Sequence, residues 1–174
     1  LYGLYAAAHF GFYIASLAHT TIAHSLSIIY TAPIWVTVLA RVMLKETFPR
    51  RKWPGVLITI VGLAIMVGFE SRITREMLLG DLLALGSAIT LGFYSIAGRS
   101  QRDEIPLTSY AASVYGMAAL WLALPGWYAY QPGTFTWAAG LAVFGSSLLP
   151  LAIGHTLYNA ALRRLHPTFV NIIA

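Results

Sequence analysis

The segment 21–42 places the strongest constraint on the fold, because it is long, almost uncharged and interspersed with small polar side chains. As a helix it would reach about 33 Å at about 1.5 Å per residue, and the hydrocarbon core of a bilayer is about 30 Å thick. Pro33 interrupts the segment. The basic residues that follow indicate a cytoplasmic end; they are Arg41, Lys45, Arg50, Arg51 and Lys52. We therefore predict a transmembrane helix with a polar face and a cytoplasmic stop.

The composition of the chain also indicates a membrane protein. Hydrophobic residues make up 58% of the sequence and charged residues 10%, whereas soluble domains carry about 25% charged residues. We predict an all-α, polytopic transmembrane helix bundle. The net charge of +5 is explained by basic residues at membrane boundaries, so no nucleic-acid partner is expected. Without cysteine, disulfides and thiolate metal sites are excluded, and no cofactor is indicated.

Six apolar spans and the beginning of a seventh can be placed from their length and from the Pro, Gly, Arg and His residues between them. They are 1–18, 21–42, 53–69, 79–98, 107–129, 137–161 and a partial span from 167. The chain is already apolar at Leu1, and the last span has about eight residues, too few to cross a bilayer. We therefore expect an internal fragment of a longer membrane protein.

Basic residues alternate between the two sides of this predicted topology. Of the eleven Lys and Arg residues, nine lie in the alternate connections 41–52, 99–106 and 163–166. The opposite connections hold Arg72 and Arg75. Because positively charged loops stay in the cytoplasm, the pattern predicts that the three basic connections are cytoplasmic. All six acidic residues lie in connections or at span ends, so no carboxylate is expected at mid-membrane.

A weak internal repeat aligns residues 14–24, IASLAHTTIAH, with residues 159–169, NAALRRLHPTF. Each copy joins the end of one span to the start of the next, and an odd number of predicted crossings separates the two. The copies would then point in opposite directions, as in the inverted repeats of many secondary transporters.

Three short blocks of sequence occur in an order that is typical of one protein family. The first is Thr31-Ala32-Pro33, Glu46, Trp53-Pro54-Gly55 and Gly62; the second is Gly80-Asp81; the third is Gly145, Tyr158-Asn159-Ala160-Ala161-Leu162 and Pro167-Thr168. Together they resemble the EamA-type drug/metabolite transporters of the DMT superfamily. The resemblance implies a ten-helix carrier with inverted five-helix repeats, incomplete here at both ends because the chain covers about helices 3 to 9. Residues 1–70 would be the C-terminal part of the first repeat (helices 3–5), and residues 79–174 the second repeat (helices 6–8 and the start of 9).

Polar side chains inside spans are costly in lipid and usually face the bundle interior or a cavity. Several lie at helical spacing on one face of their span, and the resemblance implies a central cavity among these spans. The predicted substrate-binding residues are His9, Tyr13, His24, Tyr30, Tyr94, His155, Tyr158 and Asn159. Each of them could instead hydrogen-bond its own helix or a neighbouring one, and Pro33 could be a simple kink. These alternatives stay open.

The polar faces, the inverted topology and the resemblance favour a secondary transporter that works by alternating access through a central cavity. The resemblance implies a small organic solute, either an amino acid or a drug-like molecule, and efflux. It also implies a multi-pass protein of the bacterial plasma (inner) membrane, with the lipid bilayer as its other partner and a homodimer left open. If transport is proton-coupled, we expect His155 or His24 to carry the proton, because histidine titrates near neutral pH.

The sequence is also compatible with two other functions. A non-transporting membrane scaffold subunit would have no cavity lined by polar groups. An intramembrane hydrolase could use Ser147, in Gly145-Ser146-Ser147, with His155. On one helix those two residues would lie about 12 Å apart at about 1.5 Å per residue, too far for a nucleophile and its base. No catalytic residue is therefore predicted, and the protein is not expected to be an enzyme.

Overall fold

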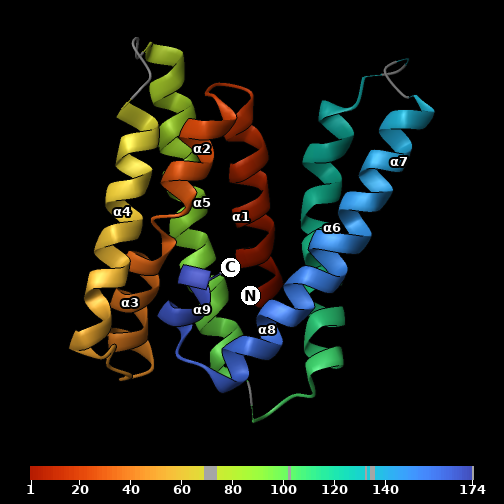
Figure 1. The fold of residues 1–174 in the computed structure, drawn as a ribbon. Coiled ribbons are helices and arrows are strands. Elements are labelled where there is room, and N and C mark those ends of the chain that lie inside the picture. Colours follow the sequence, from red (N-terminus) through yellow and green to blue (C-terminus); the bar gives the residue numbers. More distant parts are fainter. Residues whose placement is uncertain (69–73, 102, 132, 134–135, 174) are drawn as a thin grey trace.

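The computed structural model describes residues 1–68, 74–101, 103–131, 133 and 136–173, and every regular element in this part of the chain is helical (Figure 1). The predicted all-α class is confirmed. The elements in chain order are α1 (Tyr2–Leu17), α2 (Ile22–Ile29), α3 (Ala32–Met43), the 3-10 turn η1 (Arg50–Lys52), α4 (Trp53–Gly68), α5 (Arg75–Ser100), α6 (Leu107–Ala129), α7 (Trp137–Ser146), the π-helical segment η2 (Ser147–Gly154), α8 (His155–Arg164) and α9 (Pro167–Ile173).

Four helical segments of the described chain are long and apolar enough to cross a membrane: Ile22–Met43, Arg75–Ser100, Leu107–Ala129 and Trp137–Arg164. The predicted spans 1–18 and 53–69 are present as α1 and α4, which have 16 residues each. A spanning helix needs about 20 residues, and both helices come close to this length. The fold is therefore the polytopic helix bundle that the sequence predicts.

Proline explains why two of the spans are irregular. The span 21–42 consists of α2 and α3, which are separated at Tyr30 and Thr31. Pro33 lies in the first turn of α3 and has no N–H, so the carbonyl of Ile29 loses its usual helical donor. Pro150 lies inside η2, where the wider π-helical turn accommodates its ring. Both segments are thus bent at about the middle of their length.

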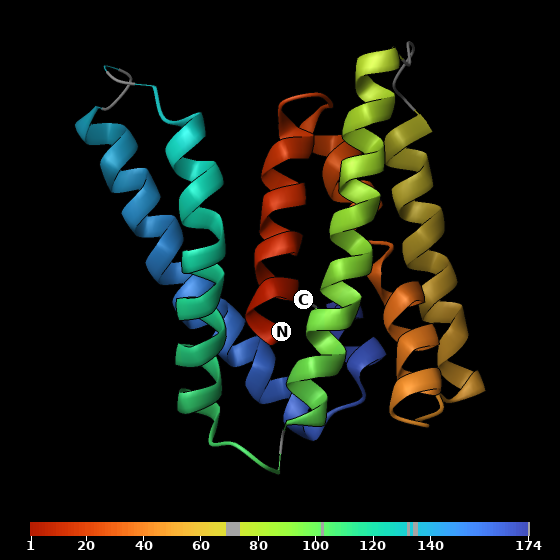
Figure 2. The same cartoon turned by 180° about the vertical axis from the view of Figure 1, so that it is seen from behind.

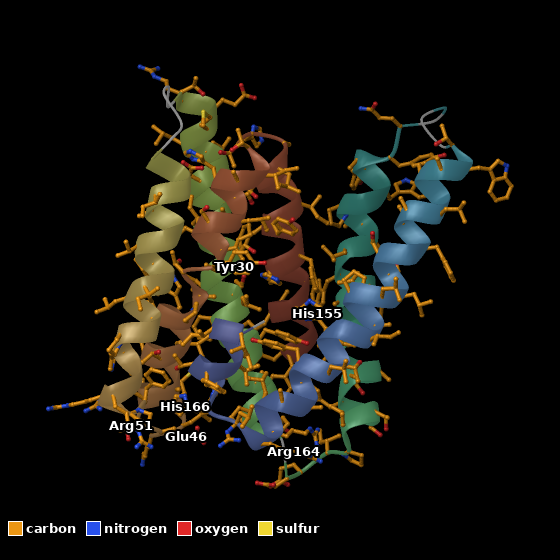
Figure 3. The ribbon with its side chains drawn as sticks, in the orientation of Figure 1. Tyr30, Glu46, Arg51, His155, Arg164 and His166 are labelled. Atoms are coloured by element: carbon orange, nitrogen blue, oxygen red, sulfur yellow. The ribbon has the colours of Figure 1, made fainter. Side chains whose placement is uncertain are left out.

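The helices alternate in direction, so that connections far apart in the sequence share one end of the bundle. α2, α5 and α7 begin at the upper end in Figure 1, and each has a threonine N-cap whose side chain accepts the N–H three residues on. Such caps stabilise a helix start by about 1 kcal/mol. Figure 3 shows Arg51 and Arg164 at the opposite end. Arg72 and Arg102 lie outside the described residues. The basic connections therefore share one end, as the charge pattern predicts.

At the basic end, one ion pair and three backbone contacts join four segments of the chain. Arg99 at the end of α5 holds Glu46, with Nη2 3.1 Å from Oε1, and its Nη1 donates to the carbonyls of Leu162 and Arg163 at 3.1 and 3.0 Å. Arg163 in turn donates to the carbonyl of Ile105 at 2.6 Å. The positive guanidinium thus caps the C-terminal end of α8, where the helix dipole is negative.

The core lies where α1 packs between α5 and α6, and small residues allow the close approach. Ala84 and Ala88 on α5 are fully buried. At the opposite end, a Cβ on Gly80 would lie 2.6 Å from Cβ and 2.7 Å from N of Thr20, so only glycine fits beside the turn between α1 and α2. In contrast, α7 has no buried residue and diverges from the core next to α6 (Figures 1 and 2).

Candidate functional site

A cavity of about 900 Å³ opens between α1, α2 and the segment η2–α8, with α5 and α9 behind it. Five predicted substrate-binding residues line it: His9, Tyr13, Tyr30, His155 and Tyr158. Figure 3 shows two of them, Tyr30 and His155, near the middle of the bundle's height. None of the described lining residues is Asp, Glu, Lys or Arg. The cavity wall therefore offers aromatic rings and neutral hydrogen-bonding groups.

His9 is fixed against α5 by hydrogen bonds that determine its tautomer. Its Nδ1 lies 2.8 Å from the Ser87 hydroxyl and 3.1 Å from the Ser87 carbonyl. The hydroxyl donates to the His9 carbonyl at 2.9 Å. Because a carbonyl can only accept, Nδ1 carries the hydrogen, which leaves Nε2 as a hydrogen-bond acceptor. His9 can therefore offer an acceptor to a solute in the cavity.

His155 lies at the start of α8 within an aromatic cluster. Its ring centroid is 5.2 Å from that of Phe10, 6.0 Å from Tyr94 and 5.9 Å from Tyr158, each in an edge arrangement. Its Nδ1 is buried and has no hydrogen-bond partner among the described residues. A buried polar atom without a partner costs about 1–3 kcal/mol, and a ligand or water in the cavity would relieve that cost.

Tyr158 connects the cavity wall to α9. Its hydroxyl lies 2.5 Å from the Ser95 hydroxyl, which also accepts a hydrogen bond from the Asn171 amide at 3.2 Å. Asn171 lines the cavity as well. This chain of polar groups holds the rings of α8 and the start of α9 against α5, so the wall is shaped before any solute enters.

Two further predicted residues, Tyr94 and Asn159, lie behind the wall and do not line the cavity. Both are 1% exposed. The Asn159 amide donates to the Tyr94 and Tyr115 hydroxyls at 2.5 and 3.2 Å and to the His155 carbonyl at 2.8 Å. The carbonyl accepts only, which identifies the donating nitrogen. In this structure these residues position α8, and a direct role in binding stays a prediction.

His24, the eighth predicted residue, also lies away from the cavity. It is 1% exposed, and its Nδ1 lies 3.4 Å from both carboxylate oxygens of Asp81 on α5. Asp81 lies near the start of a predicted span, in the Gly80-Asp81 block, and is not among the predicted binding residues. The sequence does show Thr20 and His24 close together in one segment and an acidic residue early in another span. Their contact, however, depends on how α2 packs against α5, which the sequence does not show.

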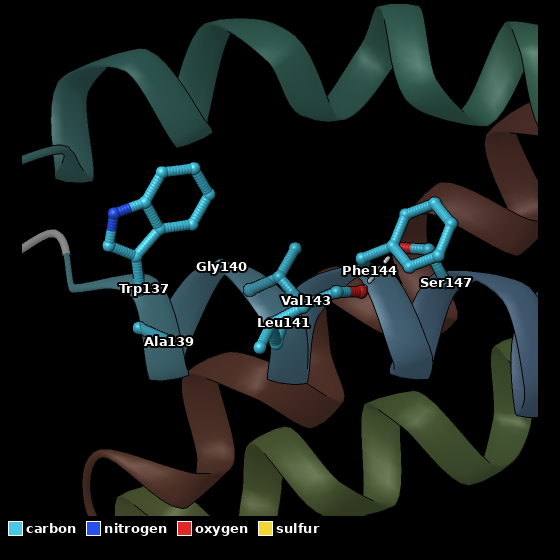
Figure 4. A pocket seen from close by; sticks show the side chains of 7 residues that line it. All are labelled: Trp137, Ala139, Gly140, Leu141, Val143, Phe144 and Ser147. Atoms are coloured by element: carbon cyan, nitrogen blue, oxygen red, sulfur yellow. Dashed lines mark hydrogen bonds between the residues drawn. The ribbon is translucent and has the colours of Figure 1, made fainter.

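A second hollow, of about 700 Å³, is lined by residues of α7 and by Ser147 and is almost entirely apolar. Figure 4 shows its lining, from Trp137 to Ser147. The exposed fraction of Trp137 is 83% and that of Phe144 is 66%. Ser147 uses its hydroxyl within its own helix, donating to the Val143 carbonyl at 2.8 Å. This face has no polar group arranged to recognise a solute, so the inner cavity is the better candidate site.

Residues 1–68 and 78–174 both match the EamA-like transporter family. The two matches cover most of the chain and exclude residues 69–77, the connection after α4 and the first three residues of α5. The chain belongs to the EamA-like transporter family. The EamA family consists of membrane transporters of the DMT superfamily, so this chain is an integral, multi-pass membrane protein. The resemblance drawn from the three sequence blocks is thus confirmed.

A solved structure described only as "Crystal structure of protein" superposes on this EamA chain with a TM-score of 0.78 at 19% sequence identity. The superposition covers 98% of this chain and 59% of that chain. At this identity the likeness establishes the fold. The EamA chain spans little more than half the length of that relative. A comparison with curated proteins gave no match.

The geometry of the EamA chain also bears on the hydrolase alternative. The Ser147 hydroxyl is bonded to Val143, and His155 faces an aromatic cluster. A nucleophile and its base must lie within about 3 Å of each other, and no hydrogen bond joins these two side chains among the described residues. The family consists of transporters, which also favours the non-enzyme interpretation.

Proposed function

We propose that this EamA chain forms part of a secondary transporter that exports a small organic solute, an amino acid or a drug-like molecule, from bacterial cells across the inner membrane. The observation that carries the proposal is the cavity of about 900 Å³ with His9, Tyr13, Tyr30, His155 and Tyr158 on its wall. A scaffold subunit would have no reason to keep an unpartnered imidazole nitrogen beside an open space within the bundle.

The wall chemistry suits an uncharged or zwitterionic solute with apolar surface. Aromatic edges and ring faces contact apolar groups, and the His9 and His155 rings can accept or donate hydrogen bonds. Because such solutes carry groups of both kinds, amino acids and drug-like molecules are the substrate classes that we propose.

Alternating access requires one end of the bundle to close while the other opens. The ion pair between Arg99 and Glu46 joins segments around the cavity at the basic end, and the break between α2 and α3 gives the wall a short, separately hinged element. We also propose that residues 1–70 belong to the first of two inverted repeats and residues 79–174 to the second. The two separate family matches support this division.

The test is transport by the whole protein, reconstituted in proteoliposomes with a panel of radiolabelled zwitterionic amino acids and uncharged drug-like solutes. We expect at least one solute to move, and His155→Ala to slow its transport about tenfold, which corresponds to about 1.4 kcal/mol. Leu57→Ala, on the outward face of α4 where Leu57 is 56% exposed, is the matched control and should leave transport unchanged. If the protein is a scaffold, no solute will move. If His155→Ala and Leu57→Ala slow transport equally, the cavity is not the transport site.

A further inference from the structure

A second polar centre lies outside the cavity, at the end of the bundle opposite the basic connections. Asp81 accepts a hydrogen bond from the Thr20 hydroxyl at 2.9 Å, and both of its oxygens lie 3.4 Å from Nδ1 of His24. His24 is 1% exposed and the side chain of Asp81 is 20% exposed. An ionisable pair this well buried in a membrane bundle usually has a function.

The second nitrogen of His24 makes this pair unusual. Nε2 is buried and has no hydrogen-bond partner among the described residues. With Nδ1 donating to Asp81, Nε2 of the neutral ring carries a filled lone pair and is an acceptor without a donor. If Nε2 gained a proton, it would become a buried N–H with no acceptor, which costs about 1–3 kcal/mol.

Other titratable groups near this centre belong to α5 and to the turn before α2. His19 pairs with Glu76, with Nδ1 3.7 Å from Oε1, and both side chains reach solvent. Arg75 begins α5 at the same end. The described part of α4, which also packs on α2, contains no titratable residue. Asp81 is thus the group that faces His24 directly.

The helix that carries His24 also forms part of the cavity wall. α2 has eight residues, with Leu26 and Ile29 lining the cavity and Tyr30 following directly after it. It is anchored near its start by the Asp81 contacts and by the Ser16–Ser25 hydroxyl pair at 2.5 Å, and its other end meets the break before Pro33. One short, hinged helix therefore links the buried ionisable pair to the cavity.

We propose that His24 and Asp81 form the proton-binding site of this protein and that protonation moves α2 relative to α5 and reshapes the cavity wall. A proton from the aqueous phase adds to Nε2 of His24, and the new N–H gains an acceptor only if α2 moves relative to α5. By linkage, a solute that favours the moved state raises proton affinity, and proton binding raises affinity for that solute. Coupling to transport rests on the proposed function, whereas the proton site itself does not.

The test needs no identified solute. Since the chain contains no cysteine, Ile22→Cys at the exposed start of α2 can carry a single environment-sensitive fluorophore. The labelled chain in lipid nanodiscs is titrated from about pH 8 to about pH 5, the range in which histidine changes charge. We expect a sigmoidal signal change that disappears in His24→Gln and in Asp81→Asn, which is nearly isosteric and keeps hydrogen-bonding capacity.

His19→Gln is the matched control, because it removes a histidine–carboxylate pair at the same end but on the solvent side; the transition should persist. A parental chain with no transition, or a transition that survives both test variants, would overturn the proton site. Circular dichroism of each variant is the control for folding and should give the helical spectrum of the parent. Coupling is tested in proteoliposomes, where a pH gradient should accelerate solute transport by the parent. Coupling is supported if His24→Gln and Asp81→Asn still exchange the solute but are no longer accelerated by the gradient. A pH-dependent fluorescence change without any transport would refute the proposed function but would still support the proton site.

Discussion

At the scale of single residues, Tyr94 shows how polar groups hold this bundle together. Its hydroxyl accepts from the Asn159 amide at 2.5 Å behind the cavity wall, and the residue is 1% exposed. Tyr94→Phe would remove one partner of Asn159, while Tyr115 and the His155 carbonyl remain in reach. We expect a loss of about 1 kcal/mol of stability, measured by chemical unfolding in detergent.

Tyr128→Phe is the control for that change, because Tyr128 is 81% exposed and its hydroxyl lies outside the core. It should unfold at the same denaturant concentration as the parent. Equal stability of both variants would mean that the hydrogen bonds behind the cavity do not position α8.

Gly80 gives a prediction based on shape alone. An alanine Cβ there would lie 2.6 Å from Cβ and 2.7 Å from N of Thr20, and 2.9 Å from the His19 carbonyl carbon. Backbone atoms cannot move aside cheaply, so we expect Gly80→Ala to destabilise the protein by about 1–3 kcal/mol. Gly62→Ala has no atom within 4 Å of its Cβ and should be neutral or stabilising, because alanine favours the helix. A thermal unfolding series compares the two, and a neutral Gly80→Ala would contradict the close approach.

A sequence indicates which polar residues face the interior of a bundle more readily than it identifies their partners. His9 and His155 could be placed on the cavity wall because both lie inside apolar spans, where a polar side chain must find an interior. The contact between His24 and Asp81 joins residues 57 positions apart, and no local pattern specifies it. The hydrogen bonds of Asn159 to Tyr94 and Tyr115 depend in the same way on how three helices pack.

At the scale of helices, the contact of Arg99 with Glu46 and the end of α8 is the clearest case of one side chain joining several elements. The side chains are 14% and 23% exposed, so solvent screens the pair in part. We expect Glu46→Gln to cost about 1 kcal/mol, and Arg99→Met to cost more because the Leu162 and Arg163 carbonyls also lose their donor. A double-mutant cycle on unfolding free energy separates the two effects.

The exposed Glu104→Gln serves as the control for that cycle, since Glu104 lies in the same end of the bundle. No change is expected there. A coupling energy of zero between Glu46 and Arg99 would show that the ion pair does not hold the basic end together.

The helix boundaries illustrate which features of an element a sequence carries. Pro33 correctly predicted the interruption in the span 21–42, because proline removes a specific hydrogen bond. The π-helical form of the segment around Pro150 did not follow, since a proline can be accommodated by a kink, a break or a wider turn. The outward position of α7 likewise depends on what packs against it, and its uniformly apolar sequence has no single buried face.

At the scale of the whole molecule, the distribution of basic residues predicts orientation. Arg51 and Arg164 lie at one end of the bundle (Figure 3), and Tyr130 follows α6 at the other. Because positive loops stay in the cytoplasm, we expect Arg51→Cys and Arg164→Cys to react with an impermeant maleimide only in inverted vesicles. Tyr130→Cys should react only in intact cells. Reaction of Arg51→Cys and Arg164→Cys from opposite sides would contradict the topology.

The proposed transport function requires that the bundle contain a water-accessible cavity and not a packed interior. The most direct measurement is the reactivity of Tyr13→Cys, on the cavity wall, toward a small impermeant maleimide applied to each side of the membrane in turn. Leu57→Cys on the outward face of α4 is the control. We expect Tyr13→Cys to react from one side and Leu57→Cys from neither. A Tyr13→Cys variant as unreactive as Leu57→Cys from both sides would contradict it.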